Sequence, residues 1–298
     1  MSTSKTEWQG YAFGIGACIL FAFIPWYLQL LSPLGGNLLF GHRLLTHLLC
    51  ALIIIGITRR LRELIACLCD PRQLAILLIT APLIALQWWL FFWAPVSGFT
   101  VDMAMGYFLL PLTMAFTGRL VFDEEMRPLQ WLAILVAIAG VGIELRSTGT
   151  FSWVTLLVCL GYPPYFILRR RLPLDTPLNF AAENFLLLPV GLILVSMAAS
   201  AGEQLVPSGS YGLALLFGAG ALGTIAMLAF VASASRLSFT VFGLLGYLEP
   251  ILLMAVALFV LDESISDEQA VSYAMFSAAV VFVVVDSYLR WKRTTPVS

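Results

Sequence analysis

Long apolar runs, separated by short polar joints or joints rich in Pro and Gly, make up most of the chain. The sequence divides into ten such runs, each close to the length of about 20 residues that an α-helix needs to cross a bilayer. The runs lack the alternation of apolar and polar residues that is typical of membrane β-strands. The predicted helices cover residues 9–31, 37–57, 73–94, 98–120, 129–146, 151–169, 178–200, 210–233, 239–261 and 268–290.

Composition indicates the solvent that these runs face. Of the 298 residues, 60% are hydrophobic and 11% are charged, and the mean hydropathy is +0.95. A soluble domain carries about a quarter charged residues. The apolar residues are too numerous for a core alone, so many of them must face lipid. We therefore predict an all-α membrane protein with ten transmembrane helices.

The Lys and Arg residues predict the orientation of the helices, because basic residues near helix ends stay on the cytoplasmic side. With the N-terminus inside, only Arg146 falls at a periplasmic helix end, and Arg43 lies within the second predicted helix. An even number of helices then leaves both termini in the cytoplasm. The other basic residues fall in cytoplasmic segments: Lys5, Arg59, Arg60, Arg62, Arg72, Arg119, Arg127, Arg169, Arg170, Arg171, Arg236, Arg290, Lys292 and Arg293.

An internal repeat divides the chain into two halves, residues 1–148 and 149–298. Sliding the sequence along itself by about 140 residues aligns several short motifs. Because each half contains five predicted helices, the second half must enter the membrane from the opposite side, which gives two inverted five-helix repeats. The aligned motifs are Phe99-Thr100-Val101 with Phe239-Thr240-Val241, Gly106-Tyr107 with Gly246-Tyr247, Pro111 with Pro250, and Asp123-Glu124 with Asp262-Glu263.

Further motifs resemble the EamA branch of the drug/metabolite transporter superfamily and, within it, the RarD-like proteins. The resemblance covers nearly the whole chain and implies a bacterial inner-membrane carrier. Two positions depart from the family pattern, since Asp123-Glu124-Glu125 replaces a Gly-Glu motif and Glu249 precedes Pro250. The motifs are Pro25-Trp26-Tyr27, His42-Arg43, Trp88 to Ala94, Gly106-Tyr107-Phe108 with Pro111, Trp131-Leu132-Ala133, Gly140-Val141, Glu183 with Leu187-Leu188-Pro189, and Arg236-Leu237.

Four ionisable residues within the apolar runs are candidates for the solute path: Arg43, Asp102, Glu183 and Glu249. Each costs on the order of 2.5 to 3.5 kcal/mol to insert, so such residues usually line a cavity. Arg43 and Asp102 enter from the same side and form a predicted ion pair, which we interpret either as part of the solute path or as a structural link. Arg43 and Glu183 are predicted to lie at opposite depths. Glu183 and Glu249 are available for substrate cations or protons, and Glu249, next to Pro250 near the midplane, is the predicted proton carrier.

Aromatic and polar residues complete the predicted cavity wall. Aromatic side chains away from the helix ends suit flat or amphipathic solutes. Tyr107 and Tyr247 occupy matching positions in the two repeats. The candidate substrate-path residues are His42, Arg43, Gln87, Trp88, Asp102, Tyr107, Glu183, Asn184, Tyr247 and Glu249.

Gly218, Gly220 and Gly223 match the GxGxxG spacing of a dinucleotide-binding loop. That motif requires a preceding strand, and here the glycines lie inside the helix predicted at 210–233. Small residues in membrane helices allow neighbouring helices to approach closely. We therefore interpret the three glycines as a helix-packing motif.

The predicted function is secondary transport, in which small organic metabolites or drugs are exported by alternating access through a cavity between the repeats. Two alternatives stay open. One is export of a specific amino-acid-derived compound such as a metallophore. The other is an intramembrane enzyme, although the sequence lacks the HExxH and GxSxG motifs. We expect a monomer that contacts a small solute, the lipid bilayer and protons as a coupling ion, with no nucleic acid, cofactor, metal or catalytic residue.

Overall fold

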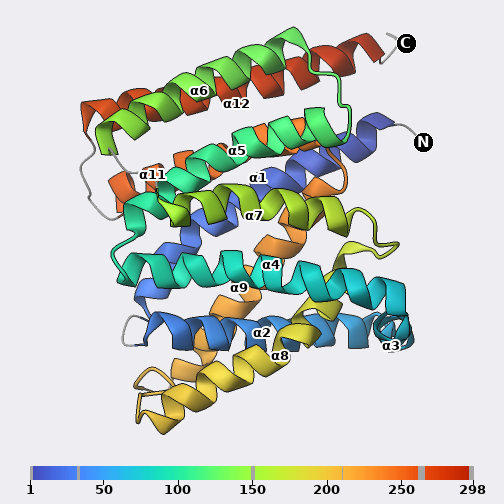
Figure 1. The fold of residues 1–298 in the computed structure, drawn as a ribbon, viewed down its shortest axis with the longest axis vertical. Coiled ribbons are helices and arrows are strands. Elements are labelled where there is room, and N and C mark those ends of the chain that lie inside the picture. Colours follow the sequence, from blue (N-terminus) through green and yellow to red (C-terminus); the bar gives the residue numbers. More distant parts are fainter. Residues whose placement is uncertain (1–2, 32–33, 149–151, 210, 261–265, 295–298) are drawn as a thin grey trace. The chain divides into compact units, whose positions relative to one another are not determined.

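The structure is a computed structural model that describes residues 3–31, 34–148, 152–209, 211–260 and 266–294. All regular secondary structure in these ranges is α-helical (Figure 1). The helices are α1 (Thr3–Gln29), α2 (Gly36–Ile57), α3 (Leu61–Cys69), α4 (Pro71–Val96), α5 (Thr100–Val121), α6 (Pro128–Thr148), α7 (Trp153–Arg169), α8 (Thr176–Ser200), α9 (Gly212–Ala234), α10 (Phe239–Leu245), α11 (Leu248–Val260) and α12 (Asp267–Thr294).

The helices have the length and composition of membrane spans. Within the described ranges, eight helices are long and apolar enough to cross a bilayer, and two shorter apolar helices cover Trp153–Arg169 and Phe239–Leu252. The prediction of an all-α membrane protein is therefore confirmed. The number of ten crossings and the inverted repeat stay predictions.

The run predicted as one helix at 239–261 is observed as two, α10 and α11. Pro250 supplies the physical reason, because proline lacks an N–H and its ring clashes with the carbonyl four residues earlier, here that of Gly246. The Gly246 amide donates to the Gly243 carbonyl at 2.8 Å, so the turn before the break is tightened. Pro111, the matching proline of the first half, lies within α5 without ending it.

A short helix that was not predicted, α3, lies in the polar joint between α2 and α4. Arg60 at its start forms an ion pair with Glu63 at 2.6 Å. Asp70 follows the end of α3 and caps α4, accepting a hydrogen bond from the Arg72 amide at 2.8 Å. The side chain of Gln73 and the backbone amides that bond to Asp70 hold the pKa of its carboxyl below the usual value.

The chain folds into two compact units, and each draws on both halves of the sequence. Unit 1 comprises Met1–Ala22, Val101–Pro163 and Ala232–Ser298. Unit 2 comprises Phe23–Thr100 and Pro164–Val231. Helices α1, α7 and α9 cross from one unit into the other, whereas α2, α4 and α8 lie in unit 2 and α6, α10, α11 and α12 lie in unit 1.

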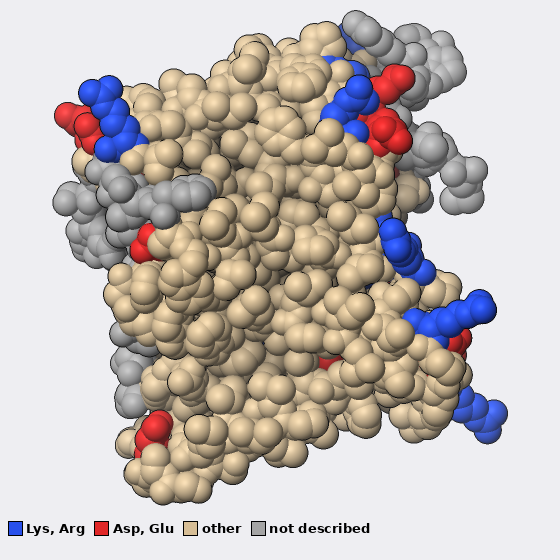
Figure 2. All heavy atoms as spheres, in the orientation of Figure 1, with Lys and Arg blue, Asp and Glu red and all other residues tan. Residues whose placement is uncertain are grey.

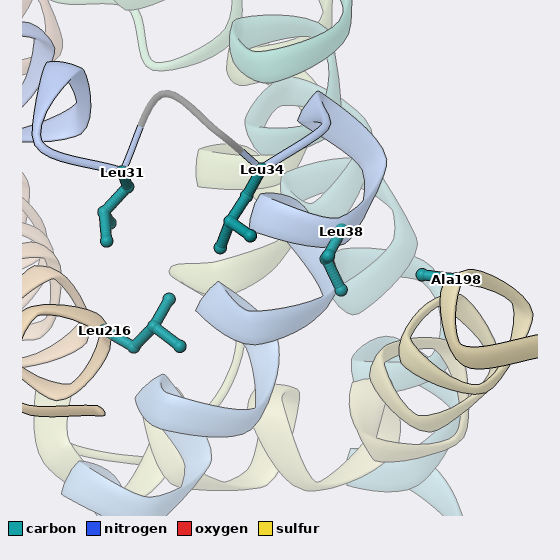
Figure 3. Close-up of a cluster of buried hydrophobic side chains, with 5 residues drawn as sticks. All are labelled: Leu31, Leu34, Leu38, Ala198 and Leu216. Atoms are coloured by element: carbon teal, nitrogen blue, oxygen red, sulfur yellow. The ribbon is translucent and has the colours of Figure 1, made fainter. Parts of the chain in front are cut away.

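In unit 2, α2 and α8 pack closely through a pair of glycines. A Cβ atom on Gly41 would lie 3.4 Å from the Gly191 carbonyl oxygen, and one on Gly191 would lie 3.3 Å from the Gly41 oxygen. Apolar side chains from α2, α8, α9 and the residues between α1 and α2 form a cluster in this unit. Figure 3 shows its members, Leu31, Leu34, Leu38, Ala198 and Leu216.

In unit 1, α6 and α12 run side by side (Figure 1). Gly140 of α6 lies against Phe276 of α12, where an added Cβ would be 2.8 Å from the ring. Arg127, just before α6, forms an ion pair with Asp286 of α12 at 2.9 Å, and the Gln130 side chain donates to the same carboxylate at 3.1 Å. Apolar packing and charge pairing therefore hold the two helices together.

The outer surface is largely uncharged. Lys, Arg, Asp and Glu take up a small share of the face drawn in Figure 2. Large aliphatic side chains are exposed along the middle of several helices. Examples are Leu135 of α6, which is 60% exposed, and Ile193 of α8, which is 56% exposed. Exposed apolar side chains on this scale suit contact with lipid rather than water.

Candidate functional site

A hollow in unit 2 lies between α1, α2, α4 and α9. The residues from α1, α2 and α4 belong to the first half of the sequence and those from α9 to the second, so both halves form its wall. Four polar side chains line it: Tyr27, His42, Arg43 and Thr46. The other lining residues are apolar or glycine: Ile24, Leu28, Leu31, Leu39, Phe92, Leu216, Ala219, Gly220 and Leu222.

Arg43 of α2 holds its guanidinium against two aromatic rings of α4. Its Cζ atom lies 5.1 Å from the ring centre of Trp88 and 5.6 Å from that of Phe92. The two rings share a helix face because they are four residues apart. Such cation–π contacts contribute about 0.5–2 kcal/mol and more when desolvated, which offsets part of the cost of a charge among apolar helices.

Backbone carbonyl groups hold the other three polar side chains of the hollow. The Tyr27 hydroxyl donates to the Leu215 carbonyl at 3.0 Å, and the Thr46 hydroxyl donates to the His42 carbonyl at 2.7 Å. His42 Nε2 lies 2.8 Å from the Leu205 carbonyl oxygen. Because a carbonyl oxygen only accepts, Nε2 carries the hydrogen in this contact.

Trp88 contacts both Arg43 and a buried histidine, His47. The His47 ring is 0% exposed and lies 5.2 Å from the Trp88 ring, edge to face, and 5.5 Å from that of Phe180. Asn184 donates to the Phe180 carbonyl at 2.8 Å, and the neighbouring Gln87 is also buried. Trp88, Gln87 and Asn184, predicted as substrate-path residues, thus lie in the interior of unit 2. His47 was not among the predicted site residues.

The GxGxxG glycines of α9 allow α1 and α2 to approach it. A Cβ atom on Gly220 would lie 2.2 Å from Thr46 Oγ1, and one on Gly223 would lie 2.7 Å from His47 Nε2. Both distances are shorter than real Cβ contacts. The interpretation of this motif as a packing feature is therefore confirmed.

Glu183 of α8 is part of a buried network with two residues of α7. Arg169 Nη1 donates to Glu183 Oε2 at 2.9 Å and to the Tyr165 hydroxyl at 2.9 Å. The Tyr165 hydroxyl donates to the same Glu183 oxygen at 3.2 Å. Arg169 was predicted only as one of the cytoplasmic basic residues, and Tyr165 was not predicted as a site residue. The four-residue spacing of Tyr165 and Arg169, which places both on one helix face, was the available signal.

Tyr247 of unit 1 lies buried at the break between α10 and α11. Its hydroxyl donates to the Phe108 carbonyl at 2.9 Å, and its ring stacks on Phe276 with centroids 4.8 Å apart. Tyr107, its repeat counterpart, is half-buried in α5. The two tyrosines therefore differ in burial although their sequence motifs match.

Asp102 and Glu249 are the ionisable candidates of unit 1. Both are half-buried. The Asp102 backbone carbonyl accepts a hydrogen bond from the Thr155 hydroxyl at 2.8 Å, which links α5 to α7. Glu249 lies in the first turn of α11, and Cys18 of α1 contacts its backbone.

The structure distributes the predicted site residues between the units. Arg43 and Asp102 belong to different units, so their ion pair stays a prediction. The role of each residue in a substrate path is also a prediction. Unit 2 holds His42, Arg43, Gln87, Trp88, Glu183 and Asn184, and unit 1 holds Asp102, Tyr107, Tyr247 and Glu249.

A further polar contact in unit 1 was not predicted. The Glu124 carboxylate, after α5, accepts hydrogen bonds from the backbone amides of Phe239 and Thr240 at 2.6 and 2.9 Å and from the Thr240 hydroxyl at 2.9 Å. These bonds satisfy N–H groups at the start of α10 that have no partner within the helix. In the sequence, Glu124 is part of a departure from a family motif, and no contact was predicted for it.

The chain is similar to transporters and RarD proteins over nearly its full length. It is 37% identical to the chloramphenicol-sensitive protein RarD of Pseudomonas aeruginosa, over 94% of each chain. It is 30% identical to an uncharacterized transporter of Pasteurella multocida, over 96% of this chain and 98% of the relative. It is 26% identical to protein RarD of Escherichia coli K12, over 98% of this chain and 99% of the relative. The names of these relatives point to transporters rather than enzymes.

No protein-family model matches the chain. One solved crystal structure of a protein superposes with a TM-score of 0.68 at 18% identity, covering 93% of this chain and 98% of the other. At this identity the similarity concerns the fold alone.

Proposed function

The chain belongs to the RarD family of membrane transporters, and from this membership we propose that it is a secondary carrier that exports small organic metabolites or drugs across the bacterial inner membrane. The hollow in unit 2 carries the proposal. It combines an apolar wall with a few polar groups, as small-molecule sites do. Both halves of the sequence contribute to it, as a site between two repeats requires.

The proposed mechanism is alternating access. In carriers built from inverted repeats, solute sites lie where the two repeats meet, and the repeats rock about them. The motifs shared by the two halves support this arrangement here. Proline also interrupts the helical backbone beside Glu249, and broken helices are typical of transporter sites. Arg43 and His42, which line the hollow, are proposed to contact the solute.

The proposed topology has ten crossings with both termini in the cytoplasm. The positions of the basic residues support it. An ion pair between Arg60, just before α3, and Asp175, just before α8, supports it as well, because it brings the starts of these two helices together. Reporter fusions at Lys292 and Ser208 test the topology. We expect a cytoplasmic signal at Lys292 and a periplasmic one at Ser208; a cytoplasmic signal at Ser208 would exclude the inverted repeat.

The function is tested by comparing the metabolites in the medium of a deletion strain and its parent. We expect one or a few small organic compounds to be depleted outside the deletion strain and to return with the wild-type gene. Arg43→Ala should fail to restore them although the protein stays in the membrane. Arg119→Ala, at an exposed position in the last turn of α5, is the matched control and should restore them. Identical media from both strains would contradict the proposed export.

A further inference from the structure

We propose that the short helix α3 of unit 2 lies in the membrane interface and binds the anionic headgroups of phospholipids through the arginines of its joint. This surface lies outside the hollow, and the proposal does not depend on which solute the protein carries. Three observations carry it: the direction of α3, the distribution of its apolar and polar side chains, and the charge of the joint.

The direction of α3 differs from that of the two long helices that it joins. In Figure 1, α2 and α4 run across the view, whereas α3 is seen nearly along its own axis at one end of both. Gly36–Ile57 and Pro71–Ala94 are each long and apolar enough to cross a bilayer. A helix of nine residues is too short to cross. Because α3 lies across the ends of two membrane spans, it runs along the membrane surface.

The apolar face of α3 is wider than the part that unit 2 covers. The helix packs on α4 and α8, and its buried residues are Leu64 and Cys67. Leu61 and Ile65, four residues apart on the adjoining side, are each 54% exposed. Ile57, the last residue of α2, is 78% exposed. Exposed aliphatic side chains beside membrane spans suit the acyl chains of lipid rather than water.

The other flank of α3 is polar, and Arg62 stands at the boundary. Glu63 is exposed and forms an ion pair with Arg60. With about 100° between successive residues, Arg62 falls between the apolar flank of Leu61 and Ile65 and the flank of Glu63. In an interfacial helix this boundary lies at the level of the headgroups. The exposed Arg62 guanidinium therefore reaches the depth of the lipid phosphates, whose oxygens match its planar fork.

The joint that contains α3, residues 58–72, carries four arginines and two acidic residues. Both acidic residues are engaged within the unit, Glu63 by Arg60 and Asp70 as the cap of α4. A basic segment next to the bilayer is attracted to anionic lipids, and salt weakens this attraction. The arginines are Arg59, Arg60, Arg62 and Arg72, and all except Arg60 are exposed.

Arg59 occupies a backbone position that favours glycine. Its φ is 56°, in the left-handed region, and its amide donates to the Gly56 carbonyl at 3.1 Å where α2 ends. Glycine adopts this conformation without the strain that a Cβ atom brings. The turn itself therefore does not call for arginine, and positive charge at the membrane surface is what this residue adds.

Spin labels on α3 test its position in the bilayer. Ile65→Cys and Ala66→Cys, each combined with Cys69→Ser, place a nitroxide on the apolar flank and on the polar flank, about 100° apart. Both positions are exposed, and the other four native cysteines are buried. In nanodiscs, we expect oxygen to reach the label at position 65 better than a water-soluble nickel chelate does, and the reverse at position 66. Equal access at the two positions, or the opposite order, would overturn the interfacial position of α3.

Native mass spectrometry of the full-length protein tests the lipid preference. Phosphatidylglycerol is anionic, and phosphatidylcholine with the same acyl chains is zwitterionic. We expect phosphatidylglycerol to bind more tightly, with a difference that shrinks as the ammonium acetate concentration rises. Arg59→Gly and Arg62→Gln should each lower its affinity about fivefold, the effect of one charge near an anionic surface. Arg119→Gln removes an exposed arginine of unit 1 and is the matched control, which should have no such effect. Equal affinities of the two lipids, or an equal loss in Arg119→Gln, would overturn the proposal.

Arg59→Gly also separates lipid binding from folding. Because the change relieves the left-handed residue, thermal unfolding in detergent without added lipid should show no loss of stability. A weaker preference for phosphatidylglycerol at undiminished stability would support the role of the charge, and a preference unchanged in both Arg59→Gly and Arg62→Gln would overturn it. If α3 instead received a soluble protein or a second copy of the chain, the label at position 65 would stay open to the nickel chelate and the two lipids would bind equally.

Discussion

Arg169 donates a hydrogen bond to Glu183 across 2.9 Å in the interior of unit 2, where their side chains are only 7% and 1% exposed. The pair joins the end of α7 to α8, and the Tyr165 hydroxyl contacts both members. Removing one partner of a buried ion pair leaves an uncompensated charge, which costs more than the intact pair contributes. Variants that remove one or both members of the pair can therefore separate a structural role of Glu183 from a role in transport.

Arg169→Met should lower the free energy of unfolding by about 3–5 kcal/mol, because it leaves the Glu183 carboxylate buried without its cation. The double variant Arg169→Met/Glu183→Leu should recover part of this loss, since no charge remains. Thermal unfolding of the purified protein in detergent measures both, with Arg171→Met at an exposed neighbouring position as the control. A double variant as unstable as the single one would contradict the charge argument. Normal transport by the double variant would mean that Glu183 binds neither solute nor proton.

Gly220→Ala should destabilise the protein by about 1–3 kcal/mol, the usual cost of overpacking an interior. Its new Cβ would lie 2.2 Å from Thr46 Oγ1, so Thr46 must move and lose its bond to the His42 carbonyl. Gly142→Ala in α6 is the matched control, because an added Cβ there meets nothing within 4 Å. The same unfolding measurement should show Gly142→Ala to be neutral or slightly stabilising. Equal stability of the two variants would mean that α9 packs less closely on α2 than described.

Glu124→Ala should loosen the start of α10, because it removes the acceptor for two backbone N–H groups at a cost of about 1–3 kcal/mol. Hydrogen exchange followed by mass spectrometry should show faster exchange in the peptide that covers Phe239 and Thr240. Glu124→Gln should have a smaller effect, since the amide oxygen still accepts. Glu125→Ala, next to it and exposed, should leave the exchange unchanged. Unchanged exchange in Glu124→Ala would show that these bonds do not hold α10.

Glu249→Gln tests the predicted proton carrier. The change keeps size and hydrogen bonding but removes titration, so we expect transport to stop or to become independent of pH. Transport rates are measured across about pH 5.5 to 8, a window that lies above the pKa of an ordinary exposed glutamate, about 4.3. Glu203→Gln, at an exposed position, should keep the pH dependence of the wild type. An unaltered pH profile in Glu249→Gln would exclude a proton-carrying role for this residue.

The positions of most helices were predictable from the sequence. The run at 178–200 corresponds to α8 at Thr176–Ser200, and the run at 37–57 corresponds to α2 at Gly36–Ile57. A membrane helix satisfies its own backbone hydrogen bonds, so its existence depends on a local sum of side-chain transfer energies. The packing role of the α9 glycines was also predictable from the local sequence, because no strand precedes them as a dinucleotide-binding motif requires.

The partners of the charged residues were not predictable in this way. The side chain of Glu124 bonds to Phe239, 115 residues later, and nothing near either residue indicates the contact. Pro250 accompanies a broken helix whereas Pro111 lies within a continuous one, so the local signal alone did not decide between them.

The sequence by itself determined that the protein lies in the membrane, where its helices run, and which residues are costly to bury. Each of these properties follows from the side-chain transfer energies of residues that are neighbours in the sequence. Only the tertiary structure decided that Glu183 meets Arg169, that Trp88 contacts both Arg43 and His47, and that the hollow combines residues of both halves. These contacts join helices that are distant along the chain, and their geometry depends on how whole helix faces pack. A local sequence pattern does not contain that information.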